Sequence, residues 1–330
     1  MRRLLAVAVL PLALLAAAPT GYHILTEIKV GGEGGWDYLT VDSAAHRLYV
    51  SHATHVVVID LDANKVIGDI PDTPGVHGIA IAPDLNRGFV SNGRGNNVTI
   101  FDVNTLKAIG TVATGQNPDS IRYDAVSGRV FTFNGRSNDS TAIDARSGNV
   151  AGTIKLPGKP EFSIADGKGK IYVNIEDTGE IAEIDTAKAT MTKKYSISPC
   201  TEPSGLAFDA KSRRLFSVCA NRLMAVSDPD AGKVLATPPI GAGSDGAAFD
   251  AASGYAFSSN GDGTLTVVQQ NAGKWEVLEN IATERGARTI AVDEKTHKIY
   301  LPTAKNGPAP AAGGRATFLP DSFKVLVVGK

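Results

Sequence analysis

A repeat of about 42 residues runs along the chain and limits its possible folds more than any other feature. Seven apolar segments recur at intervals of 40 to 43 residues, and each is followed by a polar turn and a second strand-like segment. The first segments end at Asp42, Ala82, Asp124, Asp166, Asp209, Asp250 and Asp293. Third and fourth strand-like segments follow, such as 56–60 and 66–70 in the first repeat. Four short strands in a repeat of this length are typical of a propeller blade.

The sequence therefore predicts an all-β protein, a seven-bladed β-propeller with four antiparallel strands in each blade. The seventh repeat supplies only three strands, at 288–293, 298–302 and 323–328. The stretch 22–30 has no blade of its own and has the character of a strand. We expect it to complete blade seven, because pairing the two ends of the chain closes the ring and removes two exposed sheet edges. Residues 21–330 then form a single domain.

The first 20 residues have the features of a signal peptide. Arg2 and Arg3 are basic, residues 4–18 are apolar, and residues 16–18 offer a small-residue cleavage site. The apolar run is shorter than the roughly 20 residues of a membrane-spanning helix. We therefore expect a periplasmic or secreted monomer without a membrane span. The net charge of −1 argues against a nucleic-acid partner.

The chain has two cysteines, Cys200 and Cys219. Both are expected at the same face of blade five, one in the loop that enters the blade and one at the end of its second strand. Antiparallel pairing would place Cys219 near Ser204, so a turn through 199–203 would bring Cys200 within bonding reach. A disulfide is the favoured interpretation in an oxidising compartment, and a free pair used for copper or redox chemistry is the alternative.

The repeat also resembles a known family. Residues 78–84 read Gly-Ile-Ala-Ile-Ala-Pro-Asp and are followed by Arg-Gly-Phe-Val-Ser-Asn at 87–92 and Val-Thr-Ile-Phe-Asp at 98–102. This pattern is similar to the YVTN-type (YncE-like) seven-bladed propeller repeat, and segments 35–41 and 285–292 resemble an exported bacterial subgroup of it. Such propellers include surface-layer and adhesion proteins, heavy subunits of quinoprotein amine dehydrogenases, and lactonases. The resemblance implies the architecture, whereas the function has to be argued from the site.

Superposition of the repeats predicts which residues face the central channel. The position five residues before each repeat anchor is expected at the top-face mouth, where the loops converge. It is occupied by Asp37, His77, Asp119, Glu161, Ser204, Asp245 and Arg288. A second ring is expected at the ends of the second strands, and it comprises His52, Asn92, Asn134, Ile175, Cys219, Asn260 and Thr303.

Carboxylates that converge on a narrow channel repel one another, so each must bind a cation, pair with a base or take up a proton. Arg288 neighbours Asp37 and Asp245, so we expect an ion-paired group of these three residues. Asp119 and Glu161 remain, with His77 beside Asp119. Two carboxylates and an imidazole suit a divalent metal or general acid–base chemistry. The alternative is a polar, water-filled channel with no ligand.

Two arginines are expected at the rim of the same mouth. Arg94 and Arg136 occupy equivalent positions in adjacent repeats, within glycine- and asparagine-rich loops. Guanidinium groups suit carboxylate or phosphate, so the pair could hold an anion. Ordinary tight turns with solvated arginines are the alternative. The final loop, 304–320, is longer than the others and is interpreted as a lid or a flexible insert.

These observations predict an exported ligand-binding or protein-interaction propeller. Its mouth would hold a cation or small polar ligand with Asp37, His77, Asp119, Glu161, Asp245, Arg288, Arg94 and Arg136. The alternative is an enzyme, a metal-assisted lactonase-like hydrolase or lyase, with His77 as the base, Asp119 and Glu161 as metal ligands, and the rim arginines on a substrate carboxylate. A scaffold for a periplasmic protein partner is a third possibility. The sequence has no serine-hydrolase elbow, haem-attachment motif or P-loop.

Overall fold

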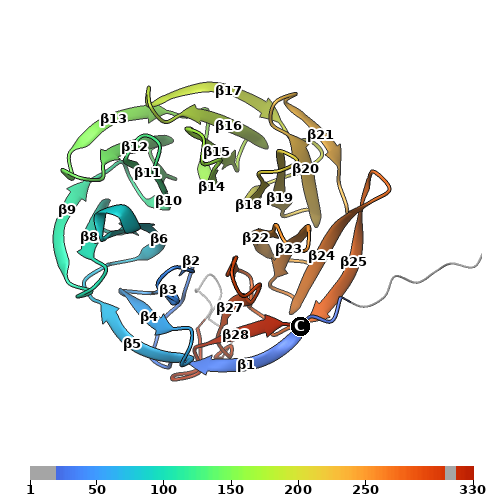
Figure 1. The fold of residues 1–330 in the computed structure, drawn as a ribbon, viewed down its shortest axis with the longest axis horizontal. Coiled ribbons are helices and arrows are strands. Elements are labelled where there is room, and N and C mark those ends of the chain that lie inside the picture. The colour runs from blue at the N-terminus through green and yellow to red at the C-terminus, as the bar shows by residue number, and fades with distance from the viewer. Residues whose placement is uncertain (1–19, 309–316) are drawn as a thin grey trace, which may run out of the picture.

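The computed structural model describes residues 20–308 and 317–330. Seven four-stranded antiparallel sheets are arranged as blades around a central axis, as the sequence predicted (Figure 1). The chain runs from the axis outward in each blade from one to six.

Blade one consists of β2 (Leu39–Asp42), β3 (Arg47–His52), β4 (His55–Asp60) and β5 (Lys65–Ile70). Blade two consists of β6 (Val76–Ala82), β7 (Arg87–Asn92), β8 (Asn97–Asp102) and β9 (Ala108–Ala113). Blade three consists of β10 (Pro118–Asp124), β11 (Arg129–Asn134), β12 (Asp139–Asp144) and β13 (Val150–Lys155). Blade four consists of β14 (Pro160–Ala165), β15 (Lys170–Ile175), β16 (Glu180–Asp185) and β17 (Thr190–Ser196). Blade five consists of β18 (Pro203–Asp209), β19 (Arg214–Cys219), β20 (Leu223–Asp228) and β21 (Lys233–Ala236). Blade six consists of β22 (Ser244–Asp250), β23 (Tyr255–Asn260), β24 (Thr264–Asn271) and β25 (Lys274–Ala282).

Blade seven joins the two ends of the chain. Its strands, from the axis outward, are β26 (Ala291–Val292), β27 (Ile299–Thr303), β28 (Lys324–Gly329) and β1 (His23–Lys29). The N-terminal strand pairs antiparallel with β28, from His23 opposite Gly329 to Lys29 opposite Lys324. The predicted closure of the ring is therefore confirmed, and Figure 1 shows the blue strand β1 beside the red strand β28.

The apolar core lies between the blades. Phe89, Val98 and Ile100 of blade two pack against Ile121 and Val130 of blade three, and equivalent clusters fill the other junctions. The second and third strands of each blade are almost entirely buried, whereas most residues of the outermost strands are exposed or half-buried. Each blade therefore depends on both neighbours to bury its apolar faces.

The aspartates that recur in the repeat hold the turns of the face opposite the predicted mouth. Asp42 Oδ1 accepts hydrogen bonds from the backbone N–H groups of Ala44 and Ala45, at 3.1 and 3.0 Å. The carboxylate satisfies backbone donors that the sheet leaves free, which is a common role for aspartate in turns. In the second repeat the first strand ends in Ala82 instead of an aspartate. A 3-10 turn, η1 (Pro83–Leu85), follows there and leads into the next strand.

The predicted disulfide is present between Cys200 and Cys219, whose Cα atoms are 5.4 Å apart. Cys219 lies opposite Pro203 in the register of β18 and β19, one residue from the expected position. The bond ties the loop that enters blade five to the end of the second strand of that blade. No helix in the described ranges is long and apolar enough to span a membrane.

Thiol titration checks this bond directly. In protein purified without reductant and then denatured, we expect no free thiol, and two thiols per chain after reduction, because the sequence has two cysteines. A Cys219→Ser variant, which leaves only Cys200, calibrates the response at one thiol. Two thiols in the unreduced wild-type protein would contradict the pairing.

Candidate functional site

The residues of the predicted axial ring lie at the start of the innermost strands. His77, Asp119 and Glu161 are each the second residue of an innermost strand, in β6, β10 and β14. In all three blades the register with the second strand shifts just after this position, for example between Val76 and Ile79. The irregularity bends the strand end and directs the side chain toward the axis.

Serines on the second strands fix this irregular backbone. Ser91 Oγ on β7 accepts a hydrogen bond from the N–H of Gly78 at 2.9 Å and donates one to the carbonyl of Asp119 in the next blade at 2.7 Å. Ser51 Oγ accepts a bond from the N–H of Asp37 at 2.8 Å. These buried serines therefore hold the backbone of the ring residues within and between blades.

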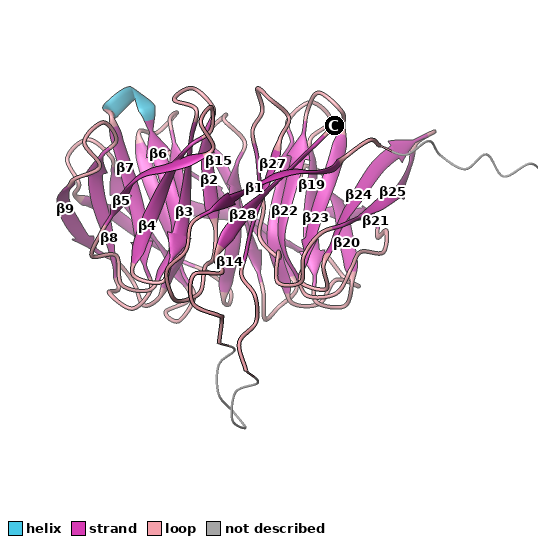
Figure 2. Cartoon of the chain, turned by 90° about the horizontal axis from the view of Figure 1, so that it is seen from below, coloured by secondary structure: helices cyan, strands magenta, loops and turns pink. Residues whose placement is uncertain are grey.

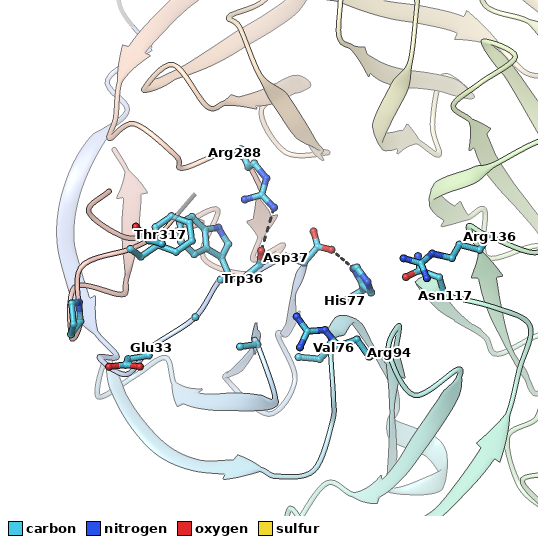
Figure 3. A pocket seen from close by; sticks show the side chains of 16 residues that line it. Glu33, Trp36, Asp37, Val76, His77, Arg94, Asn117, Arg136, Arg288 and Thr317 are labelled. Atoms are coloured by element: carbon cyan, nitrogen blue, oxygen red, sulfur yellow. Dashed lines mark hydrogen bonds and ion pairs between the residues drawn. The ribbon is translucent and has the colours of Figure 1, made fainter. Parts of the chain in front are cut away.

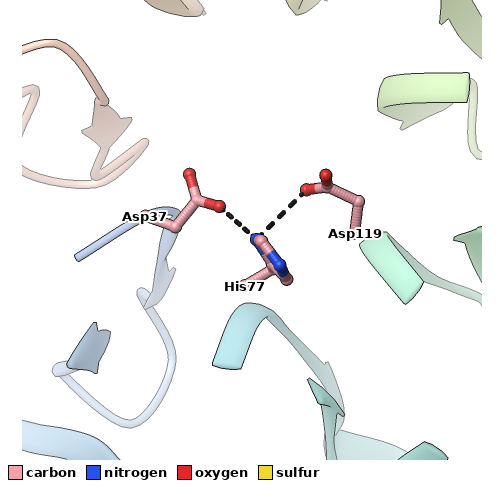
Figure 4. Close-up of side chains that lie close together, drawn as sticks. All are labelled: Asp37, His77 and Asp119. Atoms are coloured by element: carbon pink, nitrogen blue, oxygen red, sulfur yellow. Dashed lines mark hydrogen bonds and ion pairs between the residues drawn. The ribbon is translucent and has the colours of Figure 1, made fainter. Parts of the chain in front are cut away.

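Three of the ring side chains meet at one point. Asp37, His77 and Asp119 come from blades one, two and three, and each offers a donor atom within 4.8 Å of the other two (Figure 4). His77 Nδ1 lies 2.5 Å from Asp37 Oδ2 and 3.5 Å from Asp119 Oδ1. We call this group the donor triad.

The environment of the donor triad favours positive charge. Burial alone would lower the pKa of His77, but Asp119 and the hydrogen bond to Asp37 outweigh it and raise this pKa to about 9. Burial raises the pKa of Asp119 to about 7, although His77 opposes this shift. Asp119 is 7% exposed, and its Oδ1 atom accepts no hydrogen bond. The triad thus holds at least one extra proton at neutral pH, and a divalent cation is the other means of balancing its charge.

Glu161 lies apart from the donor triad, although it belongs to the same ring. Lys159 Nζ lies 3.6 Å from Glu161 Oε2 and also pairs with Glu176. Burial, reinforced by Asp119, raises the pKa of Glu161 well above its ordinary value. The predicted metal ligands were Asp119, Glu161 and His77, whereas the structure brings Asp37 to His77 and Asp119 and places Glu161 beside a lysine.

Two aromatic residues, Tyr38 and Phe162, directly follow the ring residues Asp37 and Glu161 in the sequence and lie further from the mouth. The Tyr38 hydroxyl of blade one donates to Glu161 Oε1 of blade four at 3.4 Å, and the Tyr38 ring lies 4.7 Å from that of Phe162. The Arg122 guanidinium lies 4.4 Å above the Phe162 ring. Tyr38 is 6% exposed, so this cluster forms a floor beneath the ring.

A cavity of about 800 Å³ opens at the mouth on the side of blades seven, one, two and three. Its lining includes Asp37, His77, Arg94, Asn117, Arg136 and Arg288. We call this cavity the axial cup. Figure 3 shows the Arg94 and Arg136 side chains on the same side of the cup as His77. Both predicted rim arginines therefore line the same cavity as Asp37 and His77 of the donor triad.

Arg288 pairs with one acid of the ring rather than two. Its Nε donates to Asp245 Oδ2 at 2.7 Å, and its NH2 group donates to the carbonyl of Trp36 at 3.2 Å. The expected three-membered group of Arg288, Asp37 and Asp245 is thus divided, because the Asp37 carboxylate hydrogen-bonds to His77 instead. Asp37 is therefore free of arginine and available to the donor triad.

The predicted second ring does not line the mouth, because its members are buried within the blades. His52, Asn92 and Asn134 are at most 1% exposed. The asparagines bond inside their own sheets; Asn92 Nδ2, for example, donates to Thr99 Oγ1 at 2.8 Å. The polarity of this ring therefore serves the blades and not a ligand.

The described ends of the final loop flank the axial cup. The N–H of Gly307 donates to the carbonyl of Thr317 at 2.8 Å, and Thr317, Phe318 and Pro320 line the cavity. Figure 2 shows the described ends of this loop leaving the disc at one face. The interpretation as a lid or insert concerns 304–320, of which 309–316 lie outside the described residues.

Comparison with known proteins gives the architecture. The chain is similar to a solved chain of hydrazine synthase from Kuenenia stuttgartiensis, with a TM-score of 0.71 and 15% identity over 86% of this chain and 95% of that one. Because 1769 solved chains match in this way, the fold does not point to one activity. No protein-family model matches the chain, and no curated protein sequence does.

Proposed function

We propose that this protein is an exported ligand-binding propeller whose axial cup holds a divalent metal ion between Asp37, His77 and Asp119. One observation carries the proposal: donor atoms from three consecutive blades converge beside the cavity that Asp37 and His77 line, and Oδ1 of the buried Asp119 has no hydrogen-bond partner. His77 Nδ1 lies 2.5 Å from Asp37 Oδ2 and 3.5 Å from Asp119 Oδ1. Small side-chain movements would therefore let these three atoms surround an ion with bonds of about 2.1 Å.

The chemistry of the donors selects the kind of metal. Carboxylate oxygens suit Mn²⁺, Mg²⁺ and Ca²⁺, whereas an imidazole nitrogen suits Zn²⁺ and other transition ions. A mixed set of two carboxylates and one imidazole therefore favours Mn²⁺ or Zn²⁺ over Ca²⁺. Three protein donors leave coordination positions open toward the axial cup, where a small polar ligand would bind.

The charge state of His77 supports a role in binding more strongly than a role as a catalytic base. A pKa near 9 keeps the imidazole protonated at neutral pH in the metal-free protein, so it donates a proton rather than accepting one. In the metal-bound protein His77 would be a ligand. A hydrolase or lyase at this site would therefore need another base.

The disulfide and the first 20 residues support export. A Cys200–Cys219 bond persists in oxidising compartments such as the periplasm or the cell exterior. The leader-like segment 1–20 would be removed there, leaving the propeller as the mature protein.

Metal binding is tested on chelator-treated protein by calorimetric titration and elemental analysis. We expect one Mn²⁺ or Zn²⁺ per chain, with weaker binding of Ca²⁺. An ion at 100 times its dissociation constant should stabilise the fold by about 2.7 kcal/mol, which a thermal scan detects.

Two variants locate the ion. His77→Ala should lose it, whereas Asp245→Asn, which changes a ring carboxylate outside the donor triad, should keep it. The absence of stoichiometric binding in the wild-type protein, or equal losses in both variants, would contradict the proposal.

A further inference from the structure

We propose that the axial cup binds a small anion, which Arg94 and Arg136 hold by its carboxylate or phosphate group while one of its oxygens reaches the metal. This inference rests on the proposed metal site and names the class of ligand that the site takes. Its basis is the placement of the two arginines relative to the donor triad.

Arg94 lies directly against the strand end that carries His77. Its N–H donates to the carbonyl of Pro74 at 3.2 Å, and the N–H of Gly93 donates to Gly75 at 2.9 Å. Glycine is required at both contacts. A Cβ at Gly93 would lie 2.5 Å from His77 Nε2, and a Cβ at Gly75, where φ is +66°, would lie 2.6 Å from Arg94 Cγ.

Arg136 repeats this arrangement in blade three. Its N–H donates to the carbonyl of Gln116 at 3.1 Å, and the N–H of Gly135 donates to Asn117, two residues before Asp119, at 2.9 Å. Both arginine loops are thus fastened to the chain segments that deliver triad ligands. Both side chains are exposed, and neither forms an ion pair in the described part of the chain.

The other blades do not offer arginine at this position, which is the second residue after the second strand. The equivalent residues in blades one to seven are Thr54, Arg94, Arg136, Asp177, Asn221, Asp262 and Lys305. Asp177 and Asp262 accept hydrogen bonds from the backbone of their own blades, at 2.9 and 2.7 Å. The turn itself therefore does not require arginine, and the two arginines occur on the blades that supply His77 and Asp119.

The charge of the metal-loaded axial cup favours an anion. The two carboxylates of the donor triad balance a divalent ion, Asp245 balances Arg288, and Lys159 lies beside Glu161. Arg94 and Arg136 form no ion pair in the described part of the chain, and Glu33 is the one lining acid outside the donor triad, so the cup keeps a net positive charge. Guanidinium groups pair well with carboxylate and phosphate oxygens, and open metal positions accept the same oxygens.

The test uses Mn²⁺-loaded full-length protein, titrated calorimetrically with malate and with inorganic phosphate. We expect one anion per chain, and the tighter of the two tells whether the natural ligand carries carboxylate or phosphate. The double variant Arg94→Ala/Arg136→Ala should retain Mn²⁺ and weaken anion binding by at least about 30-fold. Lys305→Ala, which removes a cation from the equivalent position of blade seven, should change it by less than about 3-fold.

Failure of this proposal is distinguishable from failure of the metal site. If the wild-type protein binds Mn²⁺ but neither anion, or if the double arginine variant binds them as tightly as the wild type does, the anion proposal is overturned and the metal site stands. If Mn²⁺ does not bind, the same titrations are made on metal-free protein. Anion binding that is lost in the double arginine variant then supports the role of Arg94 and Arg136, and anion binding that does not depend on them overturns it.

Discussion

Asp119→Asn is expected to weaken Mn²⁺ binding by about 100-fold or more, because it removes a buried carboxylate that we propose as a metal ligand. The isosteric change Glu161→Gln, at the next position of the ring, should leave the affinity within about 3-fold. Glu161 lies beside Lys159 and Tyr38 rather than with the donor triad. Calorimetric titration of the two variants at the same pH measures both effects.

Although Asp119→Asn should weaken metal binding, it should raise the stability of the metal-free protein. The folded-state pKa of Asp119, about 7, lies above its ordinary value because of burial. The native state therefore holds this proton more tightly than the unfolded chain does, and ionisation of Asp119 destabilises the fold as the pH rises. At pH 8, metal-free Asp119→Asn should unfold at a higher temperature than the wild type. Lower affinity together with higher stability is characteristic of a residue kept for binding. Loss of stability with unchanged Mn²⁺ affinity would contradict this role.

Much of the site follows from the repeat alone. Once the period is known, each blade contributes one residue at the same height, so the members of the axial ring and the rim arginines could be predicted from the sequence. The partners within the ring could not. His77 lies between Asp37 and Asp119, and Asp37 also neighbours Arg288, so side-chain conformation decides which acid pairs with which base.

Contacts across the axis could not be predicted from the repeat either. Superposition of the blades compares each one with the others but does not show which side chains meet across the axis. The bond from Tyr38 to Glu161 joins residues 123 positions apart. It joins blade one to blade four, which are not neighbours in the ring. The second ring was misjudged because its side chains are buried within the blades, where the asparagines bond to the third strand of their own blade.

His52 shows what happens where such a bond is missing. In blades two, three and six, an asparagine at this position donates to a threonine on the third strand: Asn92 to Thr99, Asn134 to Thr141, and Asn260 to Thr266. In blade one the threonine is replaced by Val57, which lies opposite Val50. His52 is 1% exposed and packs on Phe323, and neither ring nitrogen has a hydrogen-bond partner.

This buried imidazole is expected to make the fold sensitive to acid. Burial, and then repulsion from His55, lower the pKa of His52 to about 4. Because its value in the unfolded chain is about 6.5, the unfolded state takes up the proton first as the pH falls. Stability is therefore lost between about pH 6.5 and pH 4. Between pH 7.5 and pH 4.5 this residue should reduce the free energy of unfolding by about 2 to 3 kcal/mol.

The double variant His52→Asn/Val57→Thr tests this account by introducing the asparagine–threonine pair of the other blades. Urea unfolding at a series of pH values should show a smaller loss of stability on acidification than in the wild type, by the amount that His52 contributes. His23→Asn, which changes an exposed histidine, should follow the wild-type curve. If the double variant also follows that curve, protonation of His52 is not a source of acid sensitivity. If it is merely less stable at every pH, blade one requires the histidine for packing on Phe323, and the missing pair is compensated by that contact.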